Sequence, residues 1–330
     1  QQLTRCIVHT LWDTHHTQTV VGNSTNDSKF KFIIIMKKQF LLLSMLLLSN
    51  LLSSQIPDSE KQALLALYDS LNNGVEWTGI SSTALWNDTN SISDWWGITI
   101  EDDHVTEINL SISSLNGTIS SKIEDLIELK KLYITSTQIM GVIPSEIEKL
   151  INLEDLILFN NKLNGIIPSQ LSKCINLTSL YLDDNQFTGN IPDSLGDLSL
   201  TQFFINGNQL SGDINSILPS WPDLVFLGLD SFTGNLDLSN NPKIVIFFAP
   251  DNQFTTINVK NGNNTVLTNF RTTNSPNLTC IQVDNPTDAS NGVSSYQHWN
   301  TDSTVTFSED CSTLSVSDYV INSGLIFYPN

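Results

Sequence analysis

The sequence is poor in basic residues. Its 330 residues include 15 lysines and arginines against 34 aspartates and glutamates, which gives a formal net charge of −19 at pH 7. Proteins that bind nucleic acid or anionic membranes need clustered lysine and arginine to neutralise phosphate groups. The charge therefore excludes nucleic acid as a partner, and we interpret it as the solubilising surface of a secreted protein.

Catalytic and metal-binding motifs are also missing. After residue 55 the chain has only two histidines, His104 and His298, and it has no Gly-x-Ser-x-Gly, no His-Glu-x-x-His and no phosphate-binding glycine loop. The run Glu101–His104 could suggest a metal cluster, but we interpret it as the polar turn between two strands, Ile98–Ile100 and Val105–Leu110. We therefore expect no enzyme activity, no cofactor and no metal.

Long hydrophobic runs are absent apart from one. Phe40–Leu52 is apolar over 13 residues, which is too short to span a bilayer. Two lysines precede this run and two serines follow it, an arrangement typical of a cleaved secretory signal. We expect a signal peptide over residues 36–55 that begins at Met36, an untranslated and disordered upstream segment over 1–35, no membrane span, and a secreted or cell-surface location.

Only four cysteines are present. Cys6 lies in the upstream segment, and Cys174 lies at a position of the repeats described below that suits a small apolar residue, so we interpret it as a buried thiol. In an oxidising compartment, Cys280 and Cys311 can form a disulfide that closes a loop of about 30 residues. The loop-entropy model gives such a bond roughly 3–4 kcal/mol of stabilisation. Two free thiols are the alternative.

What the sequence does contain is a regular repeat. Apolar residues stand two positions before and two positions after each of six glycines, which are spaced 24, 24, 24, 23 and 22 residues apart. The glycines are Gly117, Gly141, Gly165, Gly189, Gly212 and Gly234. A period of this length indicates one supersecondary unit stacked on copies of itself, which is a solenoid.

Each repeat carries three signals that define its backbone. The alternation Leu156-x-Leu158 predicts a short strand with one buried face. After the strand comes an asparagine that can bond backbone groups of its own turn and of the neighbouring turn, at Asn161, Asn185 and Asn208. A glycine then occupies a position that a Cβ atom would crowd, as at Gly117, Gly141, Gly165 and Gly189. An Ile-Pro pair keeps the chain extended before a short helical piece.

Written from Leu153, the unit reads Leu-x-x-Leu-x-Leu-x-x-Asn-x-Leu-x-Gly-x-Ile-Pro-x-x-Leu. This pattern resembles the leucine-rich repeat, and its Leu-x-Gly-x-Ile-Pro part resembles the plant-specific subclass. The resemblance implies an α/β solenoid, a horseshoe with a parallel β-sheet on its concave face and a cap at each end. We expect the repeats to extend over residues 105–283, with shorter repeats after Leu236.

Both ends of such a stack need caps, because a terminal repeat would expose its core and its strand edge. Residues 56–104 are the N-terminal candidate, in which Asp58 can cap a helix. The apolar face of this helix is formed by Leu64, Leu67, Tyr68 and Leu71. The tryptophans that we expect in its core are Trp77, Trp86, Trp95 and Trp96. At the other end, we expect residues 284–315 to be held by the Cys280–Cys311 disulfide and anchored by Trp299.

Several segments resemble a narrower group. Ile56–Leu71 with the tryptophans after it, Asn277–Asp284 and Phe307–Cys311 are similar to the ends of leucine-rich-repeat proteins secreted by Bacteroidetes-type bacteria. Gly324–Asn330 is similar to the opening of the C-terminal sorting domain used in type IX secretion. The resemblance implies a bacterial surface protein whose sorting domain begins over residues 316–330 and is truncated.

The candidate functional residues lie on the concave face. Between the two buried positions of each strand stands one residue that must point to solvent, and adjacent strands lie about 4.8 Å apart. Along the stack these residues are Asn109, Tyr133, Ile157, Tyr181, Phe204 and Phe226. From Tyr133 onward they would form an apolar and aromatic row roughly 20 Å long. The row is bordered on one side by Thr135, Phe159, Asp183 and Asn206, and on the other by Lys131, Asp155, Ser179 and Gln202.

A row of exposed aromatic residues with polar borders is typical of a recognition surface, although aromatic residues also favour strand centres through packing alone. The ligand-binding candidates are Tyr133, Ile157, Phe159, Tyr181, Asp183, Phe204 and Phe226. They predict a monomeric recognition or adhesion protein that binds a protein or a glycan. The alternatives are a structural spacer, the binding region of an enzyme that continues past Asn330, and a fragment of a eukaryotic receptor ectodomain.

Overall fold

The computed structural model describes residues 56–72, 86–87, 92–111 and 115–313, all of which belong to one compact unit. The expectations for residues 1–35, 36–55 and 316–330, and for Trp77, fall outside these residues. Within them, no helix has the length and apolar character needed to cross a membrane.

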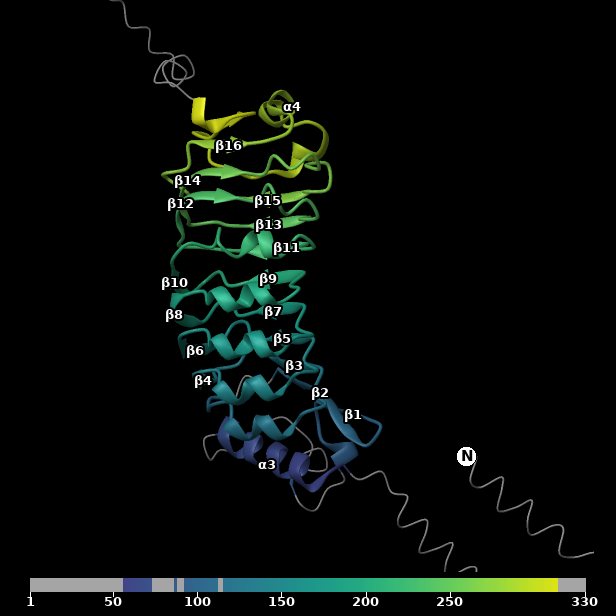
Figure 1. The fold of residues 1–330 in the computed structure, drawn as a ribbon. Helices are drawn as coiled ribbons and strands as arrows, with labels where there is room; N and C mark the ends of the chain where they lie inside the picture. Colours follow the sequence, from purple (N-terminus) through teal and green to yellow (C-terminus); the bar gives the residue numbers. More distant parts are fainter. Residues whose placement is uncertain (1–55, 73–85, 88–91, 112–114, 314–330) are drawn as a thin grey trace, which may run out of the picture. The chain divides into compact units, whose positions relative to one another are not determined.

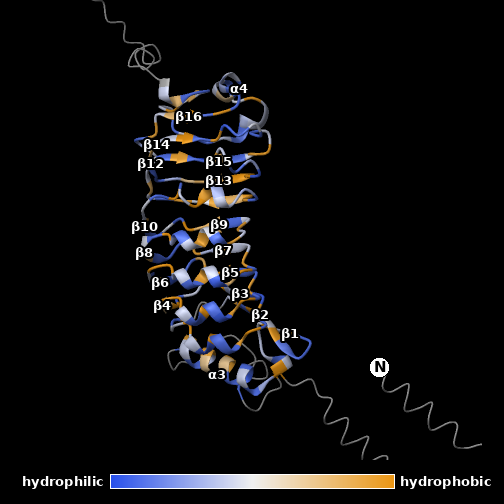
Figure 2. Cartoon of the chain, viewed as in Figure 1, coloured by the Kyte–Doolittle hydropathy of each residue, from blue (hydrophilic) through white to orange (hydrophobic). Residues whose placement is uncertain are grey.

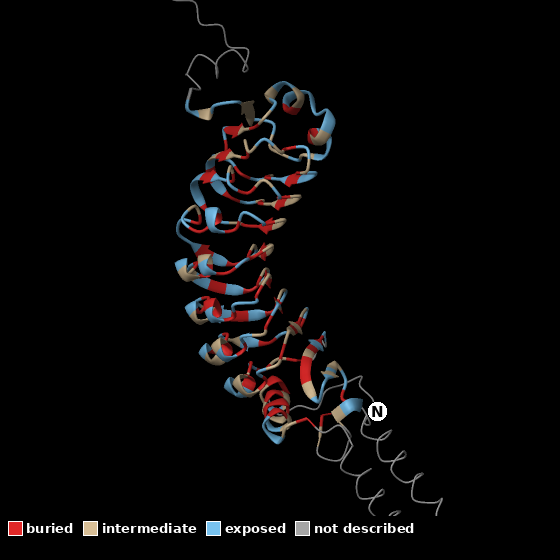
Figure 3. Cartoon of the chain, turned by 45° about the vertical axis from the view of Figure 1, so that its right-hand side comes forward, coloured by how far each residue is buried: buried red, intermediate tan, exposed pale blue. Residues whose placement is uncertain are grey.

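A nine-stranded sheet runs along the concave side of the stack (Figures 1 and 3). Its strands, in spatial order, are β1 (Ile98–Glu101), β2 (His104–Leu110), β3 (Lys131–Ile134), β5 (Asp155–Ile157), β7 (Ser179–Tyr181), β9 (Gln202–Phe204), β11 (Phe226–Gly228), β13 (Ile246–Phe248) and β15 (Asn269–Arg271). All neighbours from β2 to β15 pair in parallel, whereas β1 pairs antiparallel with β2. One strand per repeat in sequence order is the topology that a coil of short stacked repeats produces.

Two smaller parallel sheets lie on one flank. The first contains β4 (Met140–Gly141), β6 (Lys162–Gly165), β8 (Gln186–Asn190) and β10 (Gln209–Ser211). The second contains β12 (Thr233–Asp237), β14 (Gln253–Asn258), β16 (Cys280–Gln282) and β17 (Thr306–Ser308). Strands β10 and β12 belong to different sheets. Beside the break, the Asn215 side chain donates to the carbonyl of Asn235 (2.7 Å) and accepts from the amide of Asp237 (2.8 Å).

Short 3-10 helices line the convex side (Figure 3). They are η3 (Ser121–Asp125), η4 (Ser145–Lys149), η5 (Ser169–Lys173), η6 (Asp193–Asp197) and η7 (Leu218–Ser220). An extended proline precedes three of them, at Pro144, Pro168 and Pro192. Because proline has a fixed φ and no N–H, it ends the flanking strand and starts the helix. The fold is a leucine-rich-repeat solenoid with its parallel sheet on the concave face, as the sequence predicts.

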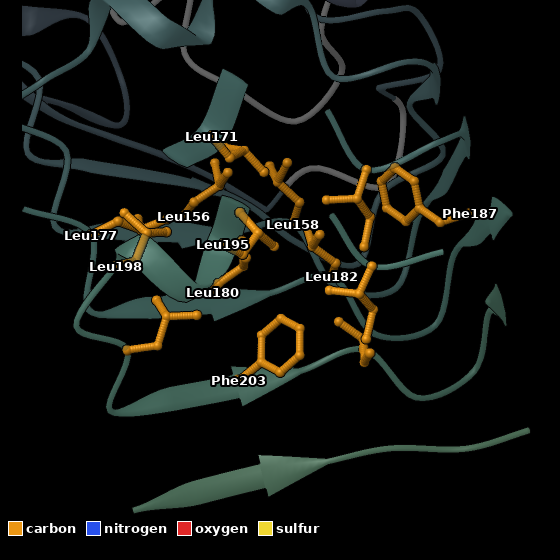
Figure 4. Packing of buried hydrophobic residues seen from close by; sticks show 14 of the residues in the cluster. Leu156, Leu158, Leu171, Leu177, Leu180, Leu182, Phe187, Leu195, Leu198 and Phe203 are labelled. Atoms are coloured by element: carbon orange, nitrogen blue, oxygen red, sulfur yellow. The ribbon is translucent and has the colours of Figure 1, made fainter. Parts of the chain in front are cut away.

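The core is one continuous stack of apolar side chains inside the coil. Leu156 and Leu158 are fully buried, while Ile157 between them is half-buried on the concave face. Figure 4 shows leucines and phenylalanines of successive repeats packed against one another, and Figure 2 shows polar residues on the outer helices. Truncating one such leucine to alanine typically costs about 2–5 kcal/mol, so the alternating pattern strongly favours this register.

A ladder of asparagines satisfies the backbone where each coil turns away from the concave sheet. The Asn185 side chain is buried; its Nδ2 donates to the carbonyls of Leu158 (2.9 Å) and Leu182 (3.1 Å), and its Oδ1 accepts from the amide of Leu163 (3.0 Å). One side chain thus joins two neighbouring coils. Donation by the amide group to buried carbonyls recurs at Asn161, Asn208 and Asn252.

Glycine is required at the repeated position for two different physical reasons. Gly141, Gly165 and Gly189 all have φ near +80°, a region that disfavours a Cβ atom. Gly117 is different, because a Cβ added there would lie 1.8 Å from the carbonyl oxygen of Ser70. Its backbone amide donates to the carbonyl of Leu71 at 3.0 Å, so the first repeat docks directly onto the preceding helix.

That helix, α3 (Asp58–Asn72), begins one position earlier than the sequence suggests. The carbonyl of Pro57 accepts from the amide of Lys61 (3.1 Å), so Pro57 holds the cap position and Asp58 lies in the first turn. The buried face of the helix includes Leu64, Leu67 and Leu71, with Tyr68 packed beside it.

The tryptophans near this helix divide between core and surface. Trp86 and Trp95 are buried, with their rings stacked at 5.7 Å. The prediction that Trp96 is a core residue is wrong, because its side chain is 36 % exposed. Its backbone carbonyl, rather than its ring, serves the core by accepting from Trp86 Nε1 (2.9 Å). A short 3-10 helix, η2 (Ile92–Asp94), immediately precedes Trp95.

The strands β1 and β2 form a hairpin. Asp102 and Asp103 have φ of 49° and 66°, as a two-residue hairpin turn requires. This is the polar turn that the sequence predicts at Glu101–His104. His104 Nδ1 lies 2.6 Å from Oε1 of the buried Glu60, and Glu60 Oε2 accepts from the amide of Val105 (2.8 Å). The hairpin is thereby tied to α3.

The C-terminal end contains α4 (Pro286–Asn291), η8 (Ser294–His298) and η9 (Cys311–Thr313). The predicted disulfide Cys280–Cys311 is present, with a Cα–Cα distance of 5.8 Å. The Trp299 ring stacks on Phe270 at 4.3 Å, and its Nε1 donates to the carbonyl of Leu267 (2.8 Å). Cys174 is fully buried, and this burial raises the pKa of its thiol to about 12.

Candidate functional site

Side chains on the concave sheet form parallel rows because the strands pair in register. The middle row runs through Tyr133, Ile157, Tyr181 and Phe204, each paired with the equivalent residue of the next strand. All four are half-buried, so each offers part of its side chain to solvent. The row is the structural basis of the candidate site.

The placement of Phe226 in this row is wrong. Phe226 pairs with Gln202, whereas the partner of Phe204 is Gly228. In the earlier repeats eight positions separate the middle-row residue from the repeated glycine, but only six separate Gly228 from Gly234. Two positions are missing after β11, so counting back from the glycine selects the wrong residue.

Gly228 ends the aromatic row. A Cβ atom at this position would lie 2.2 Å from Cδ1 of Phe204, because the phenylalanine ring covers the glycine. The row resumes with Phe248 and Arg271, which pair in β13 and β15. There the Arg271 guanidinium lies over the Phe248 ring, 5.4 Å from its centroid. The aromatic surface predicted as one stripe is thus two patches.

An open groove of about 400 Å³ lies over the first patch. Its lining residues come from strands β2 to β9 and the chain just after β3, and they are Asn109, Tyr133, Thr135, Asp155, Ile157, Ser179, Tyr181 and Gln202. Three ligand-binding candidates, Tyr133, Ile157 and Tyr181, belong to this set. Phe159, Asp183, Phe204 and Phe226 lie on the same face but do not line the groove.

Two tyrosines are held in fixed positions within the groove. The Tyr133 hydroxyl donates to Oδ2 of Asp155 and the Tyr181 hydroxyl donates to Oε1 of Gln202, both at 2.6 Å. The Tyr181 ring also stacks on Phe204, with centroids 4.8 Å apart and planes 16° apart. Each side chain therefore loses little further freedom when a ligand binds, which favours binding.

Burial and nearby carboxylates control the ionisation of these tyrosines. Burial is the larger cause that raises the pKa of Tyr133, and its hydrogen bond to Asp155 adds to it. The pKa of Tyr181 is raised by burial and by the negative charges of Asp183 and Asp155. Both hydroxyls are consequently neutral donors at physiological pH.

The row beside the groove carries polar groups with incomplete hydrogen bonding. Burial raises the pKa of Asp183 to about 6. Within the described ranges, one side-chain oxygen of each of Asp183, Asn206 and Asp230 is buried without a hydrogen-bond partner. These three side chains occupy equivalent positions in successive repeats. The repeat period places Asp183 and Asn206 in one row, whereas Asp230 joins this row only through the pairing of β9 with β11, because the repeat is shortened after β11. The sequence gives no signal of the missing donors.

The sequence predicts that the remaining groove residues lie on the concave face, but it does not indicate that they line a groove. The repeat period places all five on the concave face, but the candidate set does not include them; they are Asn109, Thr135, Asp155, Ser179 and Gln202. Across the described residues, no three histidine, cysteine, aspartate or glutamate side chains are grouped to hold a metal ion. The arrangement offers stacking surfaces and hydrogen bonds to a ligand.

The leucine-rich repeat family model matches residues 152–174 and 176–198. No curated protein matches the chain. Among solved structures, the chain is similar to the leucine-rich-repeat ectodomain of the plant membrane receptor kinase GASSHO1/SCHENGEN3 from Arabidopsis thaliana, solved in complex with CASPARIAN STRIP INTEGRITY FACTOR 2. Identity is 25%, the match covers 75% of this chain and 30% of that chain, and the TM-score is 0.60.

The ectodomain of the receptor kinase SOBIR1 from Arabidopsis thaliana also matches, with 27% identity, 53% of this chain and 93% of that chain covered, and a TM-score of 0.43. The chain spans about a third of the GASSHO1/SCHENGEN3 ectodomain. These comparisons give no support to the resemblance to bacterial proteins with a type IX sorting domain. The described residues thus form a leucine-rich-repeat solenoid that is similar to the ectodomains of plant receptor kinases.

Proposed function

We propose that the concave groove binds a polypeptide ligand and that the protein is a recognition or adhesion molecule outside the cell. One observation carries the proposal: Tyr133 and Tyr181 stand in register on either side of Ile157, each held by a hydrogen bond, over an open groove. Amphipathic aromatic side chains that are already ordered supply contact area at low entropic cost, as they do in many binding surfaces.

The similarity to receptor ectodomains supports the proposal. The GASSHO1/SCHENGEN3 ectodomain was solved in complex with a separate factor, so a solenoid of this kind can hold a partner. An extracellular location agrees with that similarity and with the signal peptide expected over residues 36–55. The resemblance at Gly324–Asn330 would add display on a bacterial surface through type IX secretion, which extending the gene sequence past Asn330 would test.

A structural spacer is the second candidate function. It needs regular repeats and end caps, but it does not need ordered tyrosines over a groove. A glycan is the alternative ligand class, because aromatic rings with neighbouring hydrogen-bonding groups can also hold sugars. The test must therefore distinguish a polypeptide, a glycan and no ligand.

The full chain would be immobilised and panned against a library of phage-displayed random peptides. Peptides selected on the wild type would then be measured on Tyr133→Ser and Tyr181→Ser. Each substitution removes a large contact residue, so we expect affinity to fall about tenfold or more. The matched control is Ile175→Ser, which removes an apolar residue that is 69 % exposed and lies outside the concave sheet.

Affinity that falls on the two groove variants and not on the control supports the proposal, provided circular dichroism shows all variants folded. Selected peptides that bind the groove variants as tightly as the wild type would contradict it. A parallel screen on a glycan array covers the alternative: glycan binding that depends on Tyr133 and Tyr181, without any peptide selection, would replace the polypeptide with a sugar. Binding of neither class would favour the spacer.

A further inference from the structure

We propose that the groove receives a cationic side chain of the ligand, with arginine as the best fit. This inference rests on the proposed function, because it names the chemistry of the polypeptide that occupies the groove. Three features of the concave face support the inference. They are the composition of the groove lining, the charges around the groove, and the Arg271 guanidinium, which already lies over an aromatic ring in the middle row of the sheet.

The lining combines aromatic rings with one carboxylate. Tyr133 and Tyr181 flank the groove, and Ile157 and the buried Ser179 lie on the strands between and beside them. Oδ2 of Asp155 accepts the Tyr133 hydroxyl; in the part of the chain that the structure describes, the other oxygen, Oδ1, accepts no hydrogen bond. A ligand that both stacks on a ring and donates to a carboxylate would satisfy this set.

Charges near the groove are predominantly negative. No lysine, arginine or histidine is among the eight lining residues, which include Asp155. The rows on either side of the groove add two carboxylates, Glu107 (which pairs with Lys131) and Asp183, and one base, Lys131. After burial, the charge of Asp155 contributes to the raised pKa of both groove tyrosines, so this carboxylate acts on both sides of the groove. This excess of carboxylates attracts a cation and disfavours an acidic ligand.

The middle row already contains the proposed contact. Phe248 and Arg271 occupy the positions in β13 and β15 that correspond to Tyr133 and Tyr181 in β3 and β7. The guanidinium of Arg271 lies 5.4 Å from the centre of the Phe248 ring. The geometry of this concave face therefore allows a planar cation to lie over a ring. Arginine suits such a site better than lysine, because its planar group stacks and donates several hydrogen bonds at once.

The test compares two probes that differ in charge and hardly in shape. Acetyl-Gly-Arg-Gly-amide and acetyl-Gly-citrulline-Gly-amide would be titrated into the full chain carrying isotope-labelled tyrosine, and ring signals assigned by Tyr133→Phe and Tyr181→Phe would report on the groove. We expect the arginine peptide to shift both rings and to bind about tenfold tighter than the citrulline peptide, the usual effect of one charge-assisted contact.

Variants separate the groove from the general acidity of the protein. Asp155→Asn keeps an acceptor for the Tyr133 hydroxyl and should abolish most of the preference for arginine. Asp197→Asn, which removes the same charge from an exposed site on the convex helix η6, should leave the preference unchanged. Raising the salt concentration should weaken only the arginine peptide.

The outcomes distinguish this inference from the proposed function. Equal binding of the two peptides in the groove would overturn the cationic side chain and leave polypeptide binding intact. An arginine preference that Asp197→Asn removes as effectively as Asp155→Asn would also overturn it, because the attraction would then be non-specific. If neither probe shifts the tyrosine rings while phage-selected peptides still need them, the inference fails alone. If the phage-selected peptides also bind Tyr133→Ser and Tyr181→Ser as tightly as the wild type, both proposals fail.

Discussion

Replacing Asn185 by alanine is the most direct test of how the coils are joined. The substitution removes Nδ2 donation to the carbonyls of Leu158 and Leu182 and leaves the amide of Leu163 without its acceptor. Asn185 is buried, so water does not replace these bonds freely. The Leu158 and Leu182 carbonyls keep donors from Asn161 and Asn208, so only the Leu163 amide is left unpaired. With about 1–3 kcal/mol for that amide and about 0.5–1.5 kcal/mol for each of the two lost bonds, the expected loss is roughly 2–6 kcal/mol.

The measurement is urea denaturation of the full chain followed by circular dichroism. Because repeat proteins can unfold in several steps, the shift of each transition midpoint is compared rather than one free energy. The control is Asn164→Ala, which changes the same residue type at an exposed position on β6 and should change stability by no more than about 0.5 kcal/mol. If Asn185→Ala and Asn164→Ala shift the midpoint equally, the asparagine ladder does not hold neighbouring coils together.

Three further outcomes can be checked in the same way. Gly117→Ala should destabilise the protein by more than about 1 kcal/mol, because the added Cβ would meet a backbone oxygen of α3 at 1.8 Å; an unchanged thermal midpoint would show that α3 moves away freely. The pKa of His104 is raised above 6.5, first by its hydrogen bond to Glu60, so this stabilisation is complete below pH 6.5 and is lost as the pH rises through the raised value. The midpoint should therefore fall over that window in the wild type and not in His104→Gln, and equal slopes would disprove the link. Reducing Cys280–Cys311 with dithiothreitol should lower stability by roughly 3–4 kcal/mol, and an unchanged urea midpoint would contradict the loop-entropy argument.

Features that repeat in the sequence could be predicted well. The fold class follows from the glycine period and from the leucine alternation, and the structure confirms both the parallel sheet and its order. The same pattern of residues recurs in successive repeats, so the strand and turn positions of one repeat can be assigned by comparison with the others. The disulfide could be predicted for a different reason, since Cys280 and Cys311 are the two cysteines that remain once Cys6 in the upstream segment and the buried Cys174 are set aside.

Features that occur once were harder to predict. Phe226 was misplaced because the shortened repeat gives no indication of which side of the strand loses residues. Trp96 resembles its buried neighbour Trp95, yet the two lie in the turn between η2 and β1, where the Ile98 amide donates to the carbonyl of Trp95, and only Trp95 enters the core. The hydrogen bonds that hold Tyr133 and Tyr181 depend on side-chain rotamers, which the period of the sequence does not encode.

We expect the break between β10 and β12 to divide the solenoid into two cooperative blocks. In repeat proteins each coil is stabilised by its own contacts and by those with its immediate neighbours, so cooperativity passes along the stack one junction at a time. At this junction the concave strands β9 and β11 still pair, but the flank contributes bonds from a side chain, Asn215, where other junctions have a strand ladder. Unfolding that starts at either end should therefore pause at this point, with one half of the stack melted and the other half intact.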